Sequence, residues 1–477
     1  MPAWWSWPLA ILISEWVIRI VMTPIAVRRR RPSAASVWLA IIYFQPLVGF
    51  ILYVLIGENR LPVRRIRLRN LAIDKVDGTQ QQAAIDPHVM QPDLHPQQQP
   101  IVTLAERLTD LPILGGNTTE FLDDTNNTIS KIIEDINNAT DHVHILMYIY
   151  RNDDTGRRVA EALIKATMRG VTCRLLVDAV GSWTALRSIL PQLREAGIHV
   201  EEALEVNFLR RGFARLDLRN HRKLIVIDGQ IAYAGSQNIV DASYGHKSLI
   251  WHDLMARVTG PSVNHLQRIF EDDWYVETNQ SLEGDNNYPH LKPTGSTPIQ
   301  ALPSGPTYPT SNYQRLVVTA IHAARRHITI TSPYLVPDEP FLQALQVAVM
   351  RGVKVEVITP QDCDQIMVGA AGRAYRRDLL EIGVSVHLYQ HGLLHAKTMT
   401  IDDEIALVGS GNFDMRSFYL NFELNLLLYG SDPTSKLRYI QKRYISQSIQ
   451  LTNEMIQNRS RIKRTLEDTA KILSPLL

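Results

Sequence analysis

Two stretches of the chain carry the same polar residues at the same spacing. Each has the pattern H-x-K-x-x-x-x-D, followed after six further residues by G-S-x-N. The first set comprises His221, Lys223, Asp228, Gly235, Ser236 and Asn238, and the second comprises His395, Lys397, Asp402, Gly409, Ser410 and Asn412. A histidine and a lysine two positions apart on a strand point to the same face, so imidazole and ammonium can converge on one anionic target.

This residue set suits group transfer at a phosphodiester. In-line displacement at phosphorus needs an entering and a leaving group on opposite sides, and two histidines related by a pseudo-twofold axis can supply both roles. One neutral imidazole would attack phosphorus to form a covalent intermediate, while the other, protonated, would donate its proton to the departing alkoxide. The ordinary histidine pKa of about 6.5 allows both forms near neutral pH.

Further polar residues are expected to support this chemistry. Charge-assisted and amide hydrogen bonds to the nonbridging oxygens are expected from Lys223, Lys397, Asn238 and Asn412, with Ser236 and Ser410 as supporting donors. Asp253 and Glu423 each lie in a strand-like segment that follows a motif. We expect them to orient the imidazoles, because a carboxylate that holds the second ring nitrogen fixes the orientation of the ring.

The motifs belong to a longer internal repeat. Met168–Val171 (MRGV) recurs as Met350–Val353, and each copy follows a helical pattern and precedes an apolar strand. Each unit then continues with a helix that ends at a glycine and with a further strand. Alternating strands and helices in both copies predict an α/β fold of two similar domains in tandem, each a sheet covered by helices, related by a pseudo-twofold axis.

The paired motifs resemble the signature of the phospholipase D superfamily, from about residue 120 to the carboxyl terminus. Further stretches narrow the resemblance to the bacterial cardiolipin synthases: RNHRKLIVIDG around His221, SPYLVPDEPFLQAL at Ser332–Leu345, GSGNFDMRSFYLNFE at Gly409–Glu423, and a terminal LSPLL. The resemblance implies two phospholipase D-like domains whose motifs meet at one active site, a covalent phosphohistidine, and neither metal nor other cofactor. It places Asp228 and Asp402 in the catalytic motifs, although loop-side hydrogen bonding is the role that we favour for them.

The resemblance also implies the reaction and its partners. A cardiolipin synthase of this type transfers a phosphatidyl group between two phosphatidylglycerol molecules at a lipid bilayer and gives cardiolipin and glycerol. By analogy with the family, the resemblance implies that His221 is the nucleophile and that His395 is the general acid and base. The alternatives are a phospholipase D-type hydrolase, another phosphatidyltransferase such as a phosphatidylserine synthase, or a nuclease. An inactive lipid-binding scaffold belongs to a different class, and two complete motifs argue against it.

The amino-terminal region is expected to anchor the protein in a membrane. Val37–Ile56 holds 20 residues without a charged side chain, enough for a helix to cross the hydrocarbon core. Trp4–Val27 is nearly as apolar, and its Glu15 and Arg19 lie four positions apart, where they can pair. We expect a two-helix transmembrane hairpin rather than a signal peptide, because a basic start and a small-residue cleavage site are missing.

Two spans place both ends of the chain on one side, and the flanking arginines weakly favour the cytoplasmic side of a bacterial inner membrane for the catalytic domains. The expected division is a two-span anchor over 1–70, a flexible linker over 71–110, and two phospholipase D-like domains over 111–290 and 291–477.

The insert Val206–Arg219 mixes apolar residues with arginines, which suits either an anionic lipid surface or a solvated loop. The tail from Ile462 is expected to pack on the second domain, with an interfacial helix as the alternative.

The overall composition excludes several classes of protein. Apolar residues make up 45% and charged residues 21% of the chain, which is typical of globular proteins and excludes wholesale disorder. The net charge of +2 gives no sign of a nucleic-acid partner. Cys173 and Cys363 are too few for a disulfide framework and lack the neighbours of a zinc site. The sequence has no GxGxxG loop that could bind the phosphates of a nucleotide, so it gives no support to nucleotide-dependent phosphoryl transfer.

Overall fold

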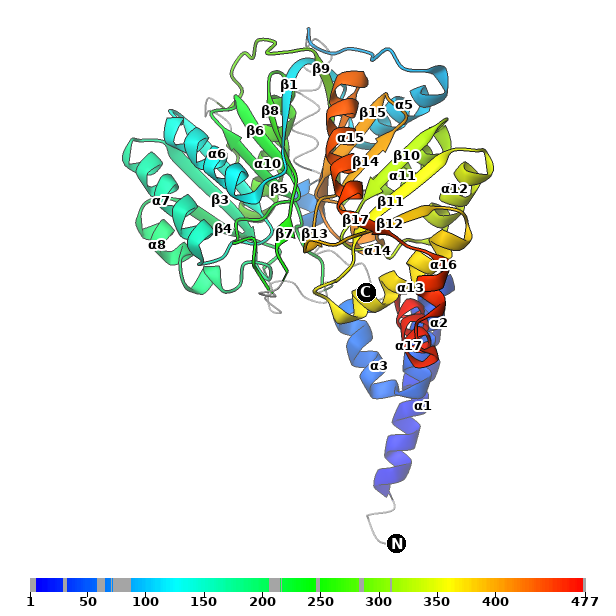
Figure 1. Ribbon diagram of the computed structural model, residues 1–477. Helices are drawn as coiled ribbons and strands as arrows, with labels where there is room; N and C mark the ends of the chain where they lie inside the picture. Colours follow the sequence, from blue (N-terminus) through cyan, green and yellow to red (C-terminus); the bar gives the residue numbers. More distant parts are fainter. Residues whose placement is uncertain are drawn as a thin grey trace.

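The computed structural model describes residues 6–28, 32–57, 65–69, 71, 87–205, 215, 217–245, 249–282, 287–308 and 311–474. Both repeats contribute to one sheet of 15 strands, which helices cover on both faces, and the amino-terminal helices project from one end of the molecule (Figure 1). Most of the insert Val206–Arg219 and the first part of the expected linker lie outside the described residues.

The first repeat contributes strands in the order β1-β8-β6-β5-β2-β3-β4. These strands span Leu114–Leu122 (β1), His142–Met147 (β2), Thr172–Asp178 (β3), His199–Ala203 (β4), Lys223–Ile227 (β5), Ile231–Gly235 (β6) and Met255–Thr259 (β8). The helices are α6 (Thr125–Asn138), α7 (Asp154–Met168), α8 (Leu190–Glu195) and α10 (Ser262–Thr278). The strands β2, β3 and β4 pair in parallel, because helical crossovers connect them.

The second repeat contributes strands in the order β9-β16-β15-β14-β10-β11-β12-β17. They span Thr297–Ser304 (β9), His327–Thr331 (β10), Lys354–Pro360 (β11), Ser385–Tyr389 (β12), Thr398–Ile401 (β14), Ile405–Gly409 (β15), Glu423–Tyr429 (β16) and Ser448–Gln450 (β17). The helices are α11 (Asn312–Ala323), α12 (Glu339–Met350), α13 (Ile366–Glu381), α14 (Met415–Tyr419), α15 (Ser431–Ser446), α16 (Asn453–Gln457) and α17 (Arg461–Ile472).

The two repeats are arranged symmetrically about the centre of the sheet. The strands β1 and β9 pair there in antiparallel fashion, and equivalent strands follow in the same order outward on either side. The motif strands β5 and β14 therefore occupy equivalent positions. Both are buried along their whole length, as expected for apolar strands covered by helices on two faces. The predicted α/β fold of two similar domains in tandem, related by a pseudo-twofold axis, is confirmed.

A second, two-stranded sheet joins the repeats beside the motif residues. It pairs β7 (Trp251–His252) of the first repeat with β13 (Leu393–Leu394) of the second, in parallel. The next residues along the chain are Asp253 and His395, respectively. This short ribbon therefore sets the position of a carboxylate from one repeat relative to a histidine from the other.

Part of the expected linker over 71–110 is instead folded into the second repeat. The helix α5 (Gln99–Thr109) follows a single 3-10 turn (Pro96–Gln98), and Ile101, Val102 and Ala105 lie in the core beneath α11. The polar composition before residue 100 conceals this helix, whose apolar positions recur at helical spacing only afterwards. The linker prediction was wrong for this portion of the chain.

The carboxyl-terminal tail packs on the second repeat as expected. The helix α17 lies along α13, and Arg373, Arg377 and Lys471 form ion pairs between the two helices. Its outer face keeps Ile462 and Leu466 exposed. The tail is therefore an integral part of the domain surface.

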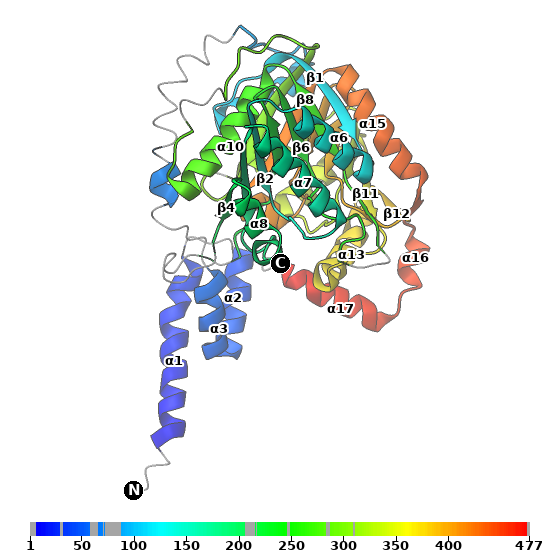
Figure 2. The same ribbon diagram turned by 90° about the vertical axis from the view of Figure 1, so that its left-hand side faces the viewer.

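The second apolar segment is not one helix, in contrast to the prediction of a span over Val37–Ile56. The helix α1 (Ser6–Val27) is continuous, but α2 (Pro32–Phe44) ends before Gln45, and α3 (Pro46–Leu52) with its π-helical extension (Tyr53–Gly57) folds back beside it (Figure 2). Proline disfavours helical geometry in the preceding residue and lacks an N–H, so the chain turns at Gln45. Among the described helices, only the one over Trp7–Val27 is long and apolar enough to cross a membrane.

Candidate active site

Both motif histidines lie where one repeat meets the other. His221 comes shortly before β5, and His395 directly follows β13. The backbone N–H of His221 donates to the carbonyl of Phe422 at 2.9 Å, and the N–H of His395 donates to the carbonyl of His252 at 2.8 Å. Each histidine is thus fastened to the backbone of the opposite repeat.

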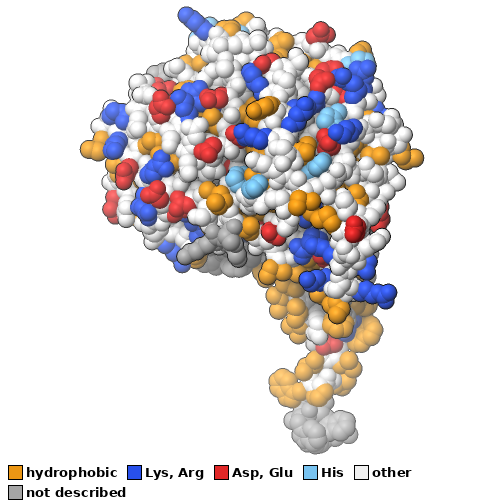
Figure 3. Space-filling view, in the orientation of Figure 1, with side chains coloured by type: hydrophobic (Ala, Val, Ile, Leu, Met, Phe, Trp, Pro, Cys, Tyr) orange, Lys and Arg blue, Asp and Glu red, His pale blue; other side chains and the backbone are white. Residues whose placement is uncertain are grey.

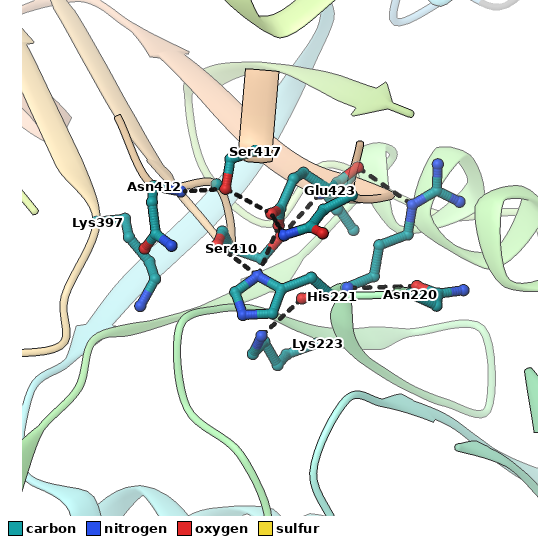
Figure 4. Close-up of polar contacts among 12 residues, drawn as sticks. Asn220, His221, Lys223, Lys397, Ser410, Asn412, Ser417 and Glu423 are labelled. Carbon is teal, nitrogen blue, oxygen red and sulfur yellow. Dashed lines mark hydrogen bonds and ion pairs between the residues drawn. The ribbon is translucent and has the colours of Figure 1, made fainter. Parts of the chain in front are cut away.

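The two expected carboxylates orient the histidines in a crossed arrangement. Nδ1 of His221 lies 2.9 Å from Oε2 of Glu423 (Figure 4), and Nδ1 of His395 lies 2.6 Å from Oδ1 of Asp253. Each carboxylate therefore serves the histidine of the other repeat, which the position of each one after its own motif does not reveal. A carboxylate at Nδ1 assigns the proton to that nitrogen and leaves Nε2 available for chemistry.

The serines of the two G-S-x-N motifs hold these carboxylates in place. Ser236 Oγ donates to Asp253 at 2.6 Å, and Ser410 Oγ donates to Glu423 at 2.5 Å. Glu423 also accepts hydrogen bonds from Ser417 and Asn421. The structure thus differs from the expectation that these serines donate to phosphate, because each hydroxyl proton is already directed at a carboxylate.

The two motif lysines are fully buried and lie beside the histidines. Lys223 Nζ donates to the carbonyl of His221 at 2.6 Å, and Lys397 makes the same bond to His395. Burial lowers the pKa of Lys223 well below its ordinary value, and it lowers the pKa of Lys397 to about 7. Since an ammonium group has three donors, each lysine keeps further donors for an anion.

The pKa values of the two histidines depend on residues from both repeats. Burial lowers the pKa of His221 to about 4, although Glu423 opposes this effect. Burial and the neighbouring Lys397 ammonium lower the pKa of His395 to about 3. The charge of Lys397 also lowers the pKa of His221, and that of Lys223 lowers the pKa of His395. Each imidazole is therefore within electrostatic range of the lysine from the other repeat.

The two motif asparagines have different surroundings. Asn238 Oδ1 accepts a hydrogen bond from the backbone N–H of Ile149, which leaves its amide N–H groups as donors. Asn412 lies beside Lys397 on the same side of the site (Figure 4), and its backbone N–H donates to Ser417. Its buried Oδ1 has no hydrogen-bond partner among the described residues. This oxygen is thus free to accept a hydrogen bond from a ligand, whereas the amide N–H side of Asn412 bonds the Asp414 carboxylate.

The two motif aspartates lie at turns and not beside the histidines. Asp228 accepts hydrogen bonds from the backbone N–H groups of Thr140, Asp141 and His142. Asp402 likewise accepts from the backbone of residues 325–327 and from the side chain of Gln98. Both aspartates have positive φ, 53° and 49°, in the tight turn that ends a motif strand. They fasten each turn to the start of the neighbouring strand.

Three aromatic residues of the site were not identified from the sequence. The ring centroids of Tyr148 and His221 are 4.7 Å apart, and those of Trp251 and His395 are 4.4 Å apart. Tyr334 also packs against His395, edge to face. Trp251 lies two residues before Asp253, so its place in the WHD sequence was an available signal. The aromatic rings enclose the imidazoles and separate them from solvent.

The remaining candidates for metal or thiol chemistry are few. Within the part of the chain that the structure describes, no group of three or more His, Cys, Asp or Glu residues is placed to hold a metal ion. Cys173 is buried, Cys363 is half-buried, and both are free thiols. The ammonium groups beside the histidines suit an anionic ligand.

Comparisons with known proteins identify the family of this chain. The family described as cardiolipin synthase, phospholipase D-like domain matches residues 132–274 and 317–444, and the phospholipase D-nuclease N-terminal family matches residues 16–58. Cardiolipin synthase A of Proteus mirabilis (strain HI4320) is 35% identical over 474 residues, which cover 98% of this chain and 96% of that protein. Cardiolipin synthase A of Erwinia tasmaniensis is 36% identical over 484 residues, covering 99% and 98%.

Among solved structures, phosphatidylserine synthase from Haemophilus influenzae Rd KW20 has the same fold, with a TM-score of 0.60 and 14% identity. The match covers 79% of this chain and 100% of that chain. The tandem α/β repeats and the paired histidines thus define a two-domain enzyme of the phospholipase D superfamily. Within this superfamily the chain belongs to the cardiolipin synthases, a membrane-associated family of phosphatidyltransferases.

Proposed function

We propose that this protein joins two phosphatidylglycerol molecules into cardiolipin and releases glycerol, through a phosphatidyl-histidine intermediate. The crossed pairing of His221 with Glu423 and of His395 with Asp253 carries the proposal, because it commits both imidazoles to one site with Nε2 free on each. Full-length similarity to cardiolipin synthases supports the same reaction.

The first half of the reaction loads His221. Its neutral Nε2 attacks phosphorus of the first phosphatidylglycerol, and the bond from phosphorus to the headgroup glycerol oxygen breaks. His395, protonated at Nε2, gives its proton to that oxygen, so glycerol leaves and the phosphatidyl group stays on His221. The bound phosphodiester offsets the effect of burial on the pKa of His395, because a nearby negative charge favours the imidazolium.

The second half of the reaction transfers the phosphatidyl group. A glycerol hydroxyl of the second phosphatidylglycerol attacks phosphorus, and neutral His395 removes the proton from that hydroxyl. The bond between phosphorus and Nε2 of His221 breaks, and cardiolipin leaves. His221 is then neutral and His395 protonated, as at the start. Burial of both rings keeps water scarce at the site, which favours alcohol over water as the acceptor.

The residues around the histidines have separate duties in this scheme. Lys223 and Lys397 bind the nonbridging oxygens of the phosphate, together with the amide N–H groups of Asn238. The unpartnered atom of Asn412 is its acceptor Oδ1, so this side chain does not donate to those oxygens. Ser236 and Ser410 fix the orienting carboxylates. Asp228 and Asp402 have a structural role at their turns and make no contact with substrate.

The membrane supplies both substrates. We place the enzyme at the cytoplasmic surface of a bacterial inner membrane, with α1 as the span that holds the site near the lipid headgroups. Apolar side chains gather along the projecting helix, whereas the domain surface carries interspersed acidic and basic groups (Figure 3). Tethering confines the active site to the plane in which phosphatidylglycerol is concentrated.

The products formed from labelled phosphatidylglycerol vesicles, without any nucleotide, test the proposed reaction. We expect cardiolipin and free glycerol in equal amounts. Phosphatidic acid as the main product would contradict the proposal and indicate a hydrolase. Binding of the vesicles without any turnover would also contradict it and indicate a lipid-binding scaffold.

The roles of the two histidines can be separated with a phosphatidyl ester of p-nitrophenol. This leaving group departs without a proton, so the loading step needs the nucleophile but not the acid. We expect His395→Ala to release a burst of p-nitrophenol and His221→Ala to release none. The opposite result would reverse the two roles, and a burst from neither variant would contradict separate acid and nucleophile functions.

A further inference from the structure

The helices of the amino-terminal region differ in their ability to cross a bilayer. The 22 residues of α1 give a length of about 33 Å, which matches the hydrocarbon core. The 13 residues of α2 give only about 20 Å before the chain turns at Gln45. The segment Pro46–Gly57, which returns beside α2, is shorter still. Neither arm of this helical hairpin reaches across the core.

The two arms pack closely on each other. A Cβ atom at Gly49 would lie 2.7 Å from Cα of Ile42, so the arms touch backbone to backbone. Trp38 packs edge to face on Tyr53, with ring centroids 5.2 Å apart. Close approach at a glycine is a common way for helices to associate in membranes. The hairpin is therefore a defined structural unit and not a bent single span.

The hairpin also packs on one end of α1. It shares an apolar cluster with Met22 and Ala26, and the Tyr53 hydroxyl donates to the carbonyl of Ile25. This is the end of α1 nearest the domains (Figure 2). The other half of α1 exposes apolar side chains along its length, Trp7, Leu9, Ile11, Leu12, Ile13, Trp16 and Val17. We therefore expect lipid, and not water, to surround this exposed half of α1.

Arg19, a charged residue in the middle of α1, forms a hydrogen bond to the backbone at the turn of the hairpin. Nε of Arg19 donates to the carbonyl of Tyr43 at 3.2 Å, and the guanidinium also pairs with Glu15 at 3.3 Å. Thr23 bonds the Tyr43 hydroxyl at 3.1 Å. A helix that ends within hydrocarbon leaves carbonyls without partners, and only protein groups can satisfy them there. The chain reversal at Gln45 thus gives a reason for two charged residues in α1: Arg19 bonds a carbonyl beside the turn, and Glu15 pairs with Arg19.

We propose that α2 and α3 form a re-entrant hairpin, which enters the bilayer from the domain side and returns to that side, so that α1 crosses the membrane alone. This inference rests on membrane anchoring by α1 and not on the reaction. It places Arg28, Arg65, Arg67 and Arg69 on the domain side, and residues 1–6 carry no arginine or lysine. Positive charge follows the cytoplasmic side, so the domains are cytoplasmic and the amino terminus lies outside.

Cysteine labelling in the full-length protein tests this topology. The background replaces the two native thiols, as Cys173→Ala and Cys363→Ser, and must retain turnover. Single cysteines are then introduced as Pro2→Cys, Arg28→Cys and Phe44→Cys, with Met168→Cys as the marker for the domains because Met168 is 81% exposed. A membrane-impermeant maleimide is applied separately to spheroplasts and to inverted membrane vesicles.

We expect Arg28→Cys and Met168→Cys to be labelled only in inverted vesicles, and Pro2→Cys only in spheroplasts. Phe44→Cys, at the end of α2 and 82% exposed to the surroundings, should react on neither side until detergent is added. Labelling of Arg28→Cys and Met168→Cys on opposite sides would establish two spans and overturn the proposal. Reaction of Phe44→Cys in spheroplasts would do the same, because the hairpin would then cross the bilayer.

Discussion

Each imidazole of the site is oriented by a carboxylate from the other repeat. Glu423 is the more heavily bonded of the two, because Ser410, Ser417 and Asn421 all donate to it. Its negative charge keeps the proton of His221 on Nδ1 and stabilises the positive charge that develops when Nε2 attacks phosphorus. This carboxylate is therefore a positioning residue for the proposed nucleophile.

We predict that Glu423→Gln lowers the rate of cardiolipin formation by about 10²- to 10⁴-fold, because an amide no longer fixes the tautomer of His221. The release of p-nitrophenol from the activated ester should fall by a similar factor, since loading is the affected step. The matched control is Glu356→Gln, which removes a buried carboxylate from His327 and His387, away from the site. Equal losses in the two variants would show that Glu423 contributes only to folding.

The pKa of Lys397 gives a second prediction at this scale. Burial lowers it to about 7, so the free enzyme loses this positive charge as the pH rises through that value. We expect the decline of kcat/KM for phosphatidylglycerol to steepen above pH about 7, because this ratio reports the protonation of the free enzyme and the charge of Lys397 is then lost in addition to the proton of His395. In Lys397→Arg this steepening should move to higher pH, since arginine stays charged. A flat profile up to pH about 9 in the wild type would contradict this role for Lys397.

Sequence reasoning found both histidines and both carboxylates, because the two motifs are in register and carry complete residue sets. It did not find which carboxylate serves which histidine. That pairing depends on contacts between residues such as His221 and Glu423, far apart in the chain, and no local pattern encodes them. The duty of Ser236 and Ser410 was missed for the same reason, since each hydroxyl was assigned to a ligand and not to a protein carboxylate.

Among the structural elements, the ribbon of β7 and β13 has the most direct bearing on catalysis. It holds Asp253 and His395 in register across the boundary between the repeats. Gly392 precedes β13 with a φ of 115°, and a Cβ atom there would lie 2.3 Å from the carbonyl oxygen of Ile250. Any side chain at this position must push the two strands apart.

We therefore predict that Gly392→Ala reduces turnover by at least about tenfold more than Gly352→Ala does. Both glycines have positive φ, 115° and 83°, so both substitutions strain the backbone. Nothing lies within 4 Å of a Cβ atom at Gly352, so only Gly392→Ala also displaces His395. Turnover and the thermal midpoint are measured for both variants. Equal turnover at equal midpoints would contradict a positioning role for the ribbon.

The helix α5 gives a prediction about stability. Ile101 is completely buried in the core of the second repeat, so Ile101→Ala should lower the free energy of unfolding by about 2–4 kcal/mol. Thr103→Ala, on the exposed side of the same helix, should change it by less than about 0.5 kcal/mol. Denaturant unfolding in detergent measures both. Equal small effects would mean that this segment behaves as a linker after all.

The order of strands and helices was predictable because each repeat alternates them regularly. The break at Gln45 was signalled by Pro46, but the uncharged run around it matched a transmembrane helix in length and so dominated the interpretation. The helix α5 was obscured by the neighbouring Gln- and Pro-rich sequence. In both cases packing against other elements, and not local composition, decided the structure.

At the scale of the whole molecule, the two repeats are one folding and catalytic unit. Their strands form a continuous sheet, and one apolar cluster combines side chains from both repeats, including Trp274 of α10 and Tyr444 of α15. Arg222 of the first repeat also donates to the carbonyls of Glu423 and Ser304 in the second. Separation of the repeats would therefore divide the active site.

The covalent intermediate provides the most direct test of the shared site. The enzyme is mixed with phosphatidylglycerol vesicles, denatured rapidly at alkaline pH, and digested for mass spectrometry of the peptides. We predict one phosphatidyl adduct, on the peptide that contains His221, in the wild type and none in His221→Ala. An adduct on any other residue, or full turnover in both His221→Ala and His395→Ala, would contradict the mechanism.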